Sequence, residues 1–271
     1  MTLFKTAALA ICAAGFPLLA QMQNNTDRQL NCSNSGNDGD RARHCEMREQ
    51  SLPSIGSLNV DPGSNGSVNI KGWLQSGVLV RARIDASGDT ESAAATLASQ
   101  VMIDGSGGQV RATGPASRND TWWSVSYEIF VPQATDLTLK TNNGSVRISD
   151  IRGRIHFDAN NGSVRLSRVA GEVSGATVNG SIQAEMVGTM FDGRQMELKT
   201  QNGSVTVSLP SQYSAHIQAE TGMGRIQSDF AMPQELNGRT RNVDFNIGAG
   251  GPPIHITTGN GSIHVKRSDT Q

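Results

Sequence analysis

The titratable residues that could do chemistry are scattered along this chain, without a catalytic or metal-binding motif. The five histidines, which show no metal-ligand spacing, are His44, His156, His216, His255 and His264. A glycosidase would need paired carboxylates facing each other across a sugar, but the strand pattern described below places Asp150 and Asp158 on different edges of one structural unit. We therefore expect a protein that is not an enzyme and has neither metal nor cofactor. The alternative is a carbohydrate-active enzyme, a polysaccharide lyase or hydrolase, on a β-helix.

The first 20 residues are typical of a secretory signal peptide. Lys5 precedes an apolar run, which ends at the small residue Ala20 before a polar stretch. Cleavage is expected after Ala20. A lipoprotein signal at Cys12 is the alternative, although Ile11 stands where such a signal has a small residue.

Cys32 and Cys45 are the two cysteines that remain after the signal is removed. An even pair in an oxidising compartment favours a disulfide. A zinc site that recruited His44 would lack a fourth ligand. We expect the bridge to enclose a polar segment and to touch no repeat, so that its loss loosens the N-terminal arm without melting the domain.

One phrase, Asn-Gly-Ser followed by alternating apolar residues, recurs along the chain. Its regular copies begin at Asn143-Gly144, Asn161-Gly162, Asn179-Gly180, Asn202-Gly203 and Asn260-Gly261. The first three glycines are 18 residues apart, and the next gap is 23 residues. An early copy lies at Asn65-Gly66 and a worn one at Met223-Gly224. Repeats of about 20 residues are typical of solenoids, in which each unit buries its apolar face against its neighbours.

Each repeat contains two predicted strands and two turns. Val146 and Ile148 alternate with polar residues, which is the period of a strand with one buried face. Asn-Gly is also the strongest hairpin signal, because the tight turn needs positive φ, so an antiparallel meander is the rival fold. A meander pairs unlike strands, whereas these strands repeat almost identically. The repeat therefore favours a parallel β-solenoid of about 18–23 residues per coil, with Gly162 at positive φ.

Composition divides the rest of the chain. Residues 21–55 are polar and are expected to form an appendage, with the packed domain beginning after Pro53. Residues 56–267 are expected to form the solenoid, and residues 268–271 a tail. Asp89 is placed to cap a short helical insertion over residues 90–99. Trp122 and Trp123 are expected to fill the wide end of the core; an exposed sugar-stacking platform at Trp122 is the alternative.

Arginines gather in two successive repeats. Stacking of the coils in register would place Arg147 over Arg165 at about the 4.8 Å strand spacing. The same two coils contain Arg152, Arg154 and Arg168. Like charges directly opposite each other destabilise a sheet.

Two interpretations of these arginines remain open. Asp150, Asp158 and Glu172 could neutralise them. Alternatively, the arginines contact an anionic surface polymer, such as an acidic polysaccharide, through salt-sensitive contacts. The formal net charge is −1, or −2 once Lys5 leaves with the signal, so no global basic field points to nucleic acid.

A family resemblance begins near Val125. It is carried by Glu128-Ile129-Phe130-Val131-Pro132, by residues 137–146, by the turns at Gly153 and Gly171 and by the later Asn-Gly-Ser phrases. These features resemble the bacterial DUF4097 family of adhesin-like, β-strand-repeat proteins over residues 125–266. The resemblance implies a right-handed, single-stranded β-helix and a cell-envelope or surface location, and it supplies no catalytic motif.

These observations predict a non-enzymatic, exported cell-envelope or surface protein, an adhesin-like interaction or scaffold solenoid. The expected location is the periplasm, the outer surface or the medium. The expected partner is an envelope polysaccharide or a surface protein, and not nucleic acid. The mature chain is expected to have no transmembrane span.

Overall fold

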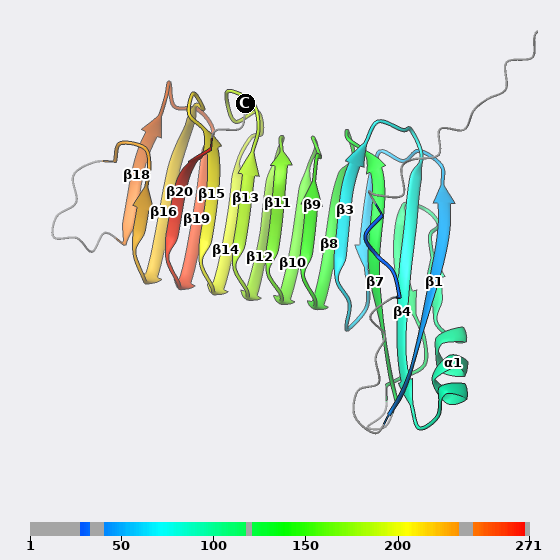
Figure 1. Ribbon diagram of the computed structural model, residues 1–271. Helices are drawn as coiled ribbons and strands as arrows, with labels where there is room; N and C mark the ends of the chain where they lie inside the picture. Colours follow the sequence, from blue (N-terminus) through cyan, green and yellow to red (C-terminus); the bar gives the residue numbers. More distant parts are fainter. Residues whose placement is uncertain (1–27, 33–40, 118–120, 233–240, 269–271) are drawn as a thin grey trace, which may run out of the picture.

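Two ten-stranded β-sheets face each other across an apolar core (Figure 1). The computed structural model describes residues 28–32, 41–117, 121–232 and 241–268. The predicted signal peptide, residues 1–20, and residues 269–271 of the predicted tail lie outside these ranges.

The spatial order of the strands defines two sheets. Sheet one contains β1 (Ala42–Leu52), β4 (Val78–Gly88), β7 (Trp122–Pro132), β3 (Val68–Trp73), β9 (Val146–Ser149), β11 (Val164–Val169), β13 (Ile182–Met186), β15 (Val205–Pro210), β20 (Ile263–Ser268) and β17 (Ile226–Ser228). Sheet two contains β18 (Asn242–Ile247), β16 (Ala215–Met223), β19 (Pro253–Asn260), β14 (Met196–Asn202), β12 (Val173–Asn179), β10 (Ile155–Asn161), β8 (Asp136–Asn143), β2 (Ser57–Asp61), β6 (Gln109–Thr113) and β5 (Met102–Asp104).

The regular strands pair in parallel with their equivalents in neighbouring repeats. Phe157 of β10, for example, pairs with Leu139 of β8 on one side and with Gly175 of β12 on the other. The chain crosses from sheet two to sheet one at each Asn-Gly-Ser corner and returns at a second, charged corner. This pairing excludes a meander for the repeats and gives a solenoid-like stack of coils. The right-handed sense of the coil stays a prediction.

Alternation along the strands fills the core. Ile155 and Phe157 of β10 and Val164 and Leu166 of β11 are each at most 1% exposed. Each such side chain stabilises the fold by about 1.5–3 kcal/mol relative to leaving it in water. The intervening residues face solvent, so every coil displays two outward rows, one on each sheet.

The prediction of positive φ at Gly162 is wrong. Neither Gly162 nor Gly144, Gly180, Gly203 or Gly261 lies in the left-handed region. Glycine is required there because the corners stack closely: a Cβ on Gly162 would lie 2.0 Å from the carbonyl oxygen of Gly144. Left-handed backbone occurs at the charged corner instead, where Asp150 has a φ of 60°.

Asparagine amides form a ladder along the Asn-Gly-Ser corner. The Nδ2 atom of Asn161 donates to Oδ1 of Asn143 at 2.9 Å, and Asn179 donates to Asn161 at 2.8 Å. Asn202 donates in turn to Asn179 at 2.9 Å, and Asn260 to Asn202 at 2.8 Å. The repeated Asn is therefore a stacking residue, as in other parallel in-register sheets.

The spatial order of the coils departs from the sequence order at the C-terminal end. The coil of β19 and β20 inserts between the coil of β14 and β15 and the coil of β16 and β17. In β16, Met223 occupies the ladder position beside Asn260, and its side chain is 68% exposed. The worn corner thus ends the amide ladder, and β18 then pairs antiparallel to β16 at the edge.

The packed part of the chain begins earlier than Pro53, contrary to expectation. Strand β1 pairs antiparallel to β4 along its whole length. Its alternating residues are charged rather than apolar, and Arg48, for instance, is held by Glu46 at 2.8 Å. An edge strand stabilised by ion pairs and backbone hydrogen bonds needs no alternation of apolar residues. The polar composition of residues 21–55 therefore predicted an appendage instead of a strand.

Helix α1 (Glu91–Ser99) is the one helix in the described ranges, and it is too short to cross a membrane. Thr90, not the predicted Asp89, is the N-cap, and its Oγ1 accepts a hydrogen bond from the Ala93 amide at 3.1 Å. At the other end, Arg48 of β1 donates to the carbonyl oxygens of Ala98, at 3.0 Å, and Val101. This arginine ties the helix to β1 at the edge of sheet one, and Figure 1 shows the helix beside the lower ends of β1 and β4.

Candidate functional site

Three of the five predicted arginines are neutralised at the charged corner. Arg154 donates to Asp136 at 2.6 Å and Arg168 to Asp150 at 2.7 Å. The pKa of Asp136 is lowered, chiefly by these hydrogen bonds from Arg154. Arg152 pairs with a carboxylate two coils away, that of Asp192, at 3.0 Å.

The expected partners of these arginines are only partly right. Asp150 does neutralise one arginine, whereas Asp158 contacts His156 at 3.2 Å and Glu172 contacts Arg194 at 3.5 Å. The 18-residue separation in Asp136–Arg154 and Asp150–Arg168 is one coil. The charges therefore pair between stacked coils rather than within one.

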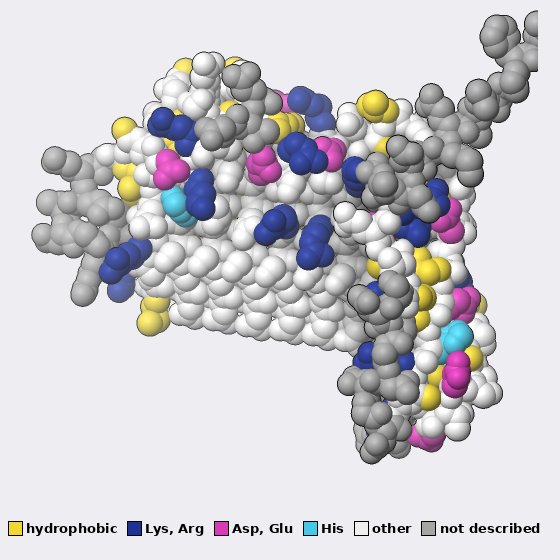
Figure 2. All heavy atoms as spheres, viewed as in Figure 1, with side chains coloured by type: hydrophobic (Ala, Val, Ile, Leu, Met, Phe, Trp, Pro, Cys, Tyr) yellow, Lys and Arg dark blue, Asp and Glu magenta, His cyan; other side chains and the backbone are white. Residues whose placement is uncertain are grey.

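Arg147 and Arg165 differ from the other three. They lie directly opposite each other on β9 and β11, on the outer face of sheet one, and both are exposed. Within the residues that the structure describes, no ion pair joins either of them to a carboxylate. Figure 2 shows Lys and Arg side chains on a white, uncharged background over the region where Figure 1 draws these strands.

A hollow of about 260 Å³ lies beside the two arginines. Lys71 and Arg168, the latter paired with Asp150, also line it, and Asn69, Ser149 and Ser167 contribute neutral polar groups. The one carboxylate in the lining is Glu128. We call this hollow and its lining the basic hollow.

Glu128 does not neutralise the basic hollow, because its charge is already compensated. The residue is 3% exposed and is ion-paired with Arg81 of β4. Its carboxylate also accepts hydrogen bonds from the backbone amides of Gln29, at 2.8 Å, and Leu30, at 3.3 Å. The positive charge of Arg147 and Arg165 thus faces solvent.

The polar surface continues along the sheet from Arg165. A second hollow of about 300 Å³ shares Arg165 and Ser167 with the first and extends past Gln183 and Thr206 to Lys266. Glu185 also lines it. The face therefore presents positive charge at both ends and mostly uncharged hydrogen-bonding groups between them.

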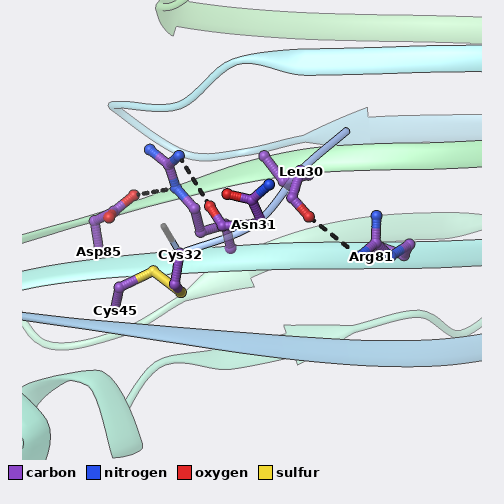
Figure 3. Close-up of a disulfide and its surroundings, with 7 residues drawn as sticks. Leu30, Asn31, Cys32, Cys45, Arg81 and Asp85 are labelled. Carbon is purple, nitrogen blue, oxygen red and sulfur yellow. Dashed lines mark hydrogen bonds and ion pairs between the residues drawn. A yellow bond between two sulfur atoms is a disulfide. The ribbon is translucent and has the colours of Figure 1, made fainter. Parts of the chain in front are cut away.

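The disulfide holds residues 28–32 over the sheet. Cys32 is bonded to Cys45 of β1, with the Cα atoms 5.8 Å apart (Figure 3). Arg81 donates to the Leu30 carbonyl oxygen at 3.1 Å, and Arg83 to that of Asn31 at 3.4 Å. The bridge lies outside the repeats, as expected, since Cys45 is on β1, which pairs with β4. The amides of the arm bind Glu128 on β7, which in turn pairs with β3.

The tryptophans pack rather than form a sugar platform. The guanidinium of Arg43 lies 5.2 Å from the ring centroid of Trp122. Trp123 packs against the core and donates its Nε1–H to the Pro115 carbonyl oxygen at 2.7 Å.

The stacking also assembles a Ser-His-Asp cluster that the sequence reading missed. Ser174 Oγ lies 3.1 Å from His156 Nδ1, and Asp158 Oδ2 lies 3.2 Å from Nε2. Hydrolase triads use the opposite ring nitrogens and a buried, orienting carboxylate, whereas Asp158 is 60% exposed. The strands here are paired on both sides, so their amides are not available as an oxyanion hole. The cluster does not support an enzyme.

No metal site forms among the described residues: no group of three or more His, Cys, Asp or Glu side chains is suitably placed. The 18-residue separation of His156 and Ser174, one coil, was the signal that could have found their contact.

The family assignment rests on the repeats themselves. A family model described as Toastrack DUF4097 matches residues 64–266. The chain belongs to this family. The match includes the coils that carry Arg147 and Arg165, and it begins after β1 and β2.

Solved structures resemble this Toastrack protein only distantly. A candidate cell adhesion protein from Clostridium sporogenes is 16% identical, with a TM-score of 0.45, covering 83% of this chain and 100% of that one. A candidate lipid-binding protein from Parabacteroides distasonis is 15% identical, with a TM-score of 0.37, covering 82% of this chain and 96% of its own. A candidate adhesin from Bacteroides fragilis is 11% identical, with a TM-score of 0.31, covering 83% and 97%. No curated protein matches the chain.

Proposed function

We propose that this Toastrack protein is an exported, non-enzymatic interaction protein of the cell envelope or surface. Its right-handed solenoid holds an anionic polymer, such as an acidic polysaccharide, on the outer face of sheet one. The predicted signal peptide and the disulfide support export, because disulfides persist in oxidising compartments. The binding proposal does not use the names of the distantly similar solved structures.

The observation that carries the proposal is the uncompensated pair of Arg147 and Arg165. Opposed like charges cost stability, and every other predicted arginine has a carboxylate partner one or two coils away. A bound anion would remove this repulsion. Arginine is suited to the task, because its planar fork donates two parallel hydrogen bonds to a carboxylate or phosphate.

Retention on an acidic-polysaccharide column tests the proposal. Changing Arg147 and Arg165 together to Gln should weaken retention at low salt and leave the fold intact or slightly more stable. The matched control changes Lys140 and Lys199 of sheet two to Gln, which removes the same charge from the opposite face. If the double arginine variant and the wild type were retained equally, Arg147 and Arg165 would not contact the polymer, and the proposal would be contradicted.

A further inference from the structure

A hollow larger than the two on sheet one lies on the other side of the molecule, over sheet two. It measures about 710 Å³. Its lining residues come from six strands that are neighbours in the sheet, β8, β10, β12, β14, β19 and β16. Five steps at the strand spacing give a length of about 24 Å. The hollow therefore runs along the coil axis, across the strands.

Small residues on the outer face create this groove. Gly222 and Gly259 pass side by side where neighbouring coils present Gln201 and Asn160, and a Cβ on Gly222 would lie 2.7 Å from the Gly259 carbonyl oxygen. Val178 supplies exposed apolar surface, being 44% exposed. The groove thus combines a largely C–H surface with the amide side chains of Asn160 and Gln201.

The charges beside the groove balance, unlike those of the basic hollow. Lys140 and Asp158 are opposite each other on β8 and β10, Lys199 follows on β14, and Glu220 lies on β16. The sign alternates in that order along the axis. A polyanion or polycation would meet a like charge at every second charged side chain, so neither is favoured.

Other polymers fit this face poorly. A peptide adding as a β-strand needs a free sheet edge, whereas the central strands of the groove are paired on both sides. A lipid chain needs a deep apolar cavity, and Val178 is the one large hydrophobic side chain in the lining. The amides of Asn160 and Gln201 and the hydroxyl of Thr257 can instead exchange hydrogen bonds with hydroxyl groups, while Val178 and Ala176 pack against C–H groups.

We infer that this groove is a second binding site, which takes a segment of an uncharged, hydroxyl-rich polymer, that is, a neutral polysaccharide, lying along the coil axis. The inference does not rest on the proposed binding of an anionic polymer to sheet one. Binding here depends on hydrogen bonds and C–H packing, so it should be insensitive to salt, whereas binding at the basic hollow should weaken with salt. The two sites would let one solenoid hold two different polymers on opposite faces.

Titration calorimetry with three neutral hexasaccharides, cellohexaose, laminarihexaose and maltohexaose, tests the second site. The wild type should bind at least one of them, with an affinity that changes less than about twofold between about 50 mM and about 500 mM salt. Val178→Arg, which fills the groove from an exposed position, should weaken binding about tenfold or more. Gln183→Arg adds the same side chain to the outer face of sheet one and should bind as the wild type does.

Gln201→Ala serves as a second variant, because it removes an exposed amide without adding bulk; it should weaken binding severalfold. Circular dichroism establishes that each variant is folded. A wild type that binds none of the three sugars would overturn the inference, as would undiminished binding by folded Val178→Arg and Gln201→Ala. Neither result would bear on retention by acidic polysaccharide, which is measured separately with the arginine variants.

Discussion

Gly162 is the residue at which replacement tests the close stacking of the coils. Gly162→Val should destabilise the protein by about 1–3 kcal/mol or more, because its Cβ would overlap the Gly144 carbonyl and force both coils apart. Thermal melts should show a lowering of about 2–4 °C per kcal/mol for a chain of this size. Ser163→Ala, at an exposed position in the same corner, should change the melting temperature little. Equal effects of the two substitutions would contradict the stacking.

Asp136 gives the charged corner a pH dependence. Arg154 holds the pKa of this carboxyl below its ordinary value, so the folded pKa lies below the unfolded one. The resulting stabilisation is present above the unfolded pKa of about 3.9 and is lost as pH falls through the folded pKa. Asp136→Asn should therefore be less stable than the wild type at neutral pH, and the difference should shrink in acid.

Urea unfolding at pH values of about 7 and about 3 measures this difference. The effect is expected to be small, because the Arg154 side chain is 71% exposed and solvent screens the pair. A gap between variant and wild type that widened on acidification would show that the ion pair does not stabilise the corner.

At the scale of elements, the Asn-Gly-Ser corner accounts for the order in which coils stack. The coil of β19 and β20 carries Asn260 and continues the amide ladder from Asn202, whereas the coil of β16 and β17 offers Met223. Asn202 therefore lies at the junction where spatial order leaves sequence order. Its side chain donates to Asn179 and accepts from Asn260.

Asn202→Ala should remove both ladder hydrogen bonds at this junction. The expected loss is about 1–2 kcal/mol, at about 1 kcal/mol per bond. Asn142→Ala is the matched control, because Asn142 makes a single amide contact, with Asn160 at 2.7 Å. Chemical unfolding compares the two, and a loss no greater for Asn202→Ala than for Asn142→Ala would contradict a structural role for the ladder.

The elements that sequence reasoning recovered are those with a regular period. The repeated phrase predicted two strands per coil and stacked corners, because every coil must satisfy the same packing. Strand β1 escaped prediction, since ion pairs rather than apolar residues stabilise it. The insertion of β19 and β20 could not be read from order along the chain; only the loss of Asn at Met223 hinted at it.

For the candidate site, the sequence placed Arg147 opposite Arg165 correctly, and of the three expected carboxylates only Asp150 pairs with one of the five predicted arginines. Asp136, the partner of Arg154, was missed because it lies one coil earlier, 18 residues before the arginine, as Asp150 does before Arg168. The groove over sheet two could not be predicted from the sequence. It arises from two outward-facing glycines, Gly222 and Gly259, on strands that become neighbours only through the coil insertion.

At the scale of the whole molecule, the disulfide joins the arm of residues 28–32 to a preformed sheet. Replacing Cys32 and Cys45 with Ser should release the arm and expose it to protease, because a bridge acts mainly by restricting the open chain. The solenoid should keep its β-sheet circular dichroism, since Arg81 still compensates Glu128. If the variant lost its β-sheet circular dichroism signal at temperatures where the wild type is folded, the expectation that the solenoid folds without the bridge would be contradicted.

The salt dependence of binding to a soluble acidic polysaccharide tests the central claim most directly. Binding of the wild type to polygalacturonate should weaken steeply as salt rises, because each neutralised charge releases about one counterion. The Arg147→Gln, Arg165→Gln double variant should bind more weakly at low salt, with a slope of log K against log salt reduced by about two. The Lys140→Gln, Lys199→Gln control should keep the wild-type slope. Identical slopes for the wild type and the arginine variant would contradict an anionic polymer on sheet one.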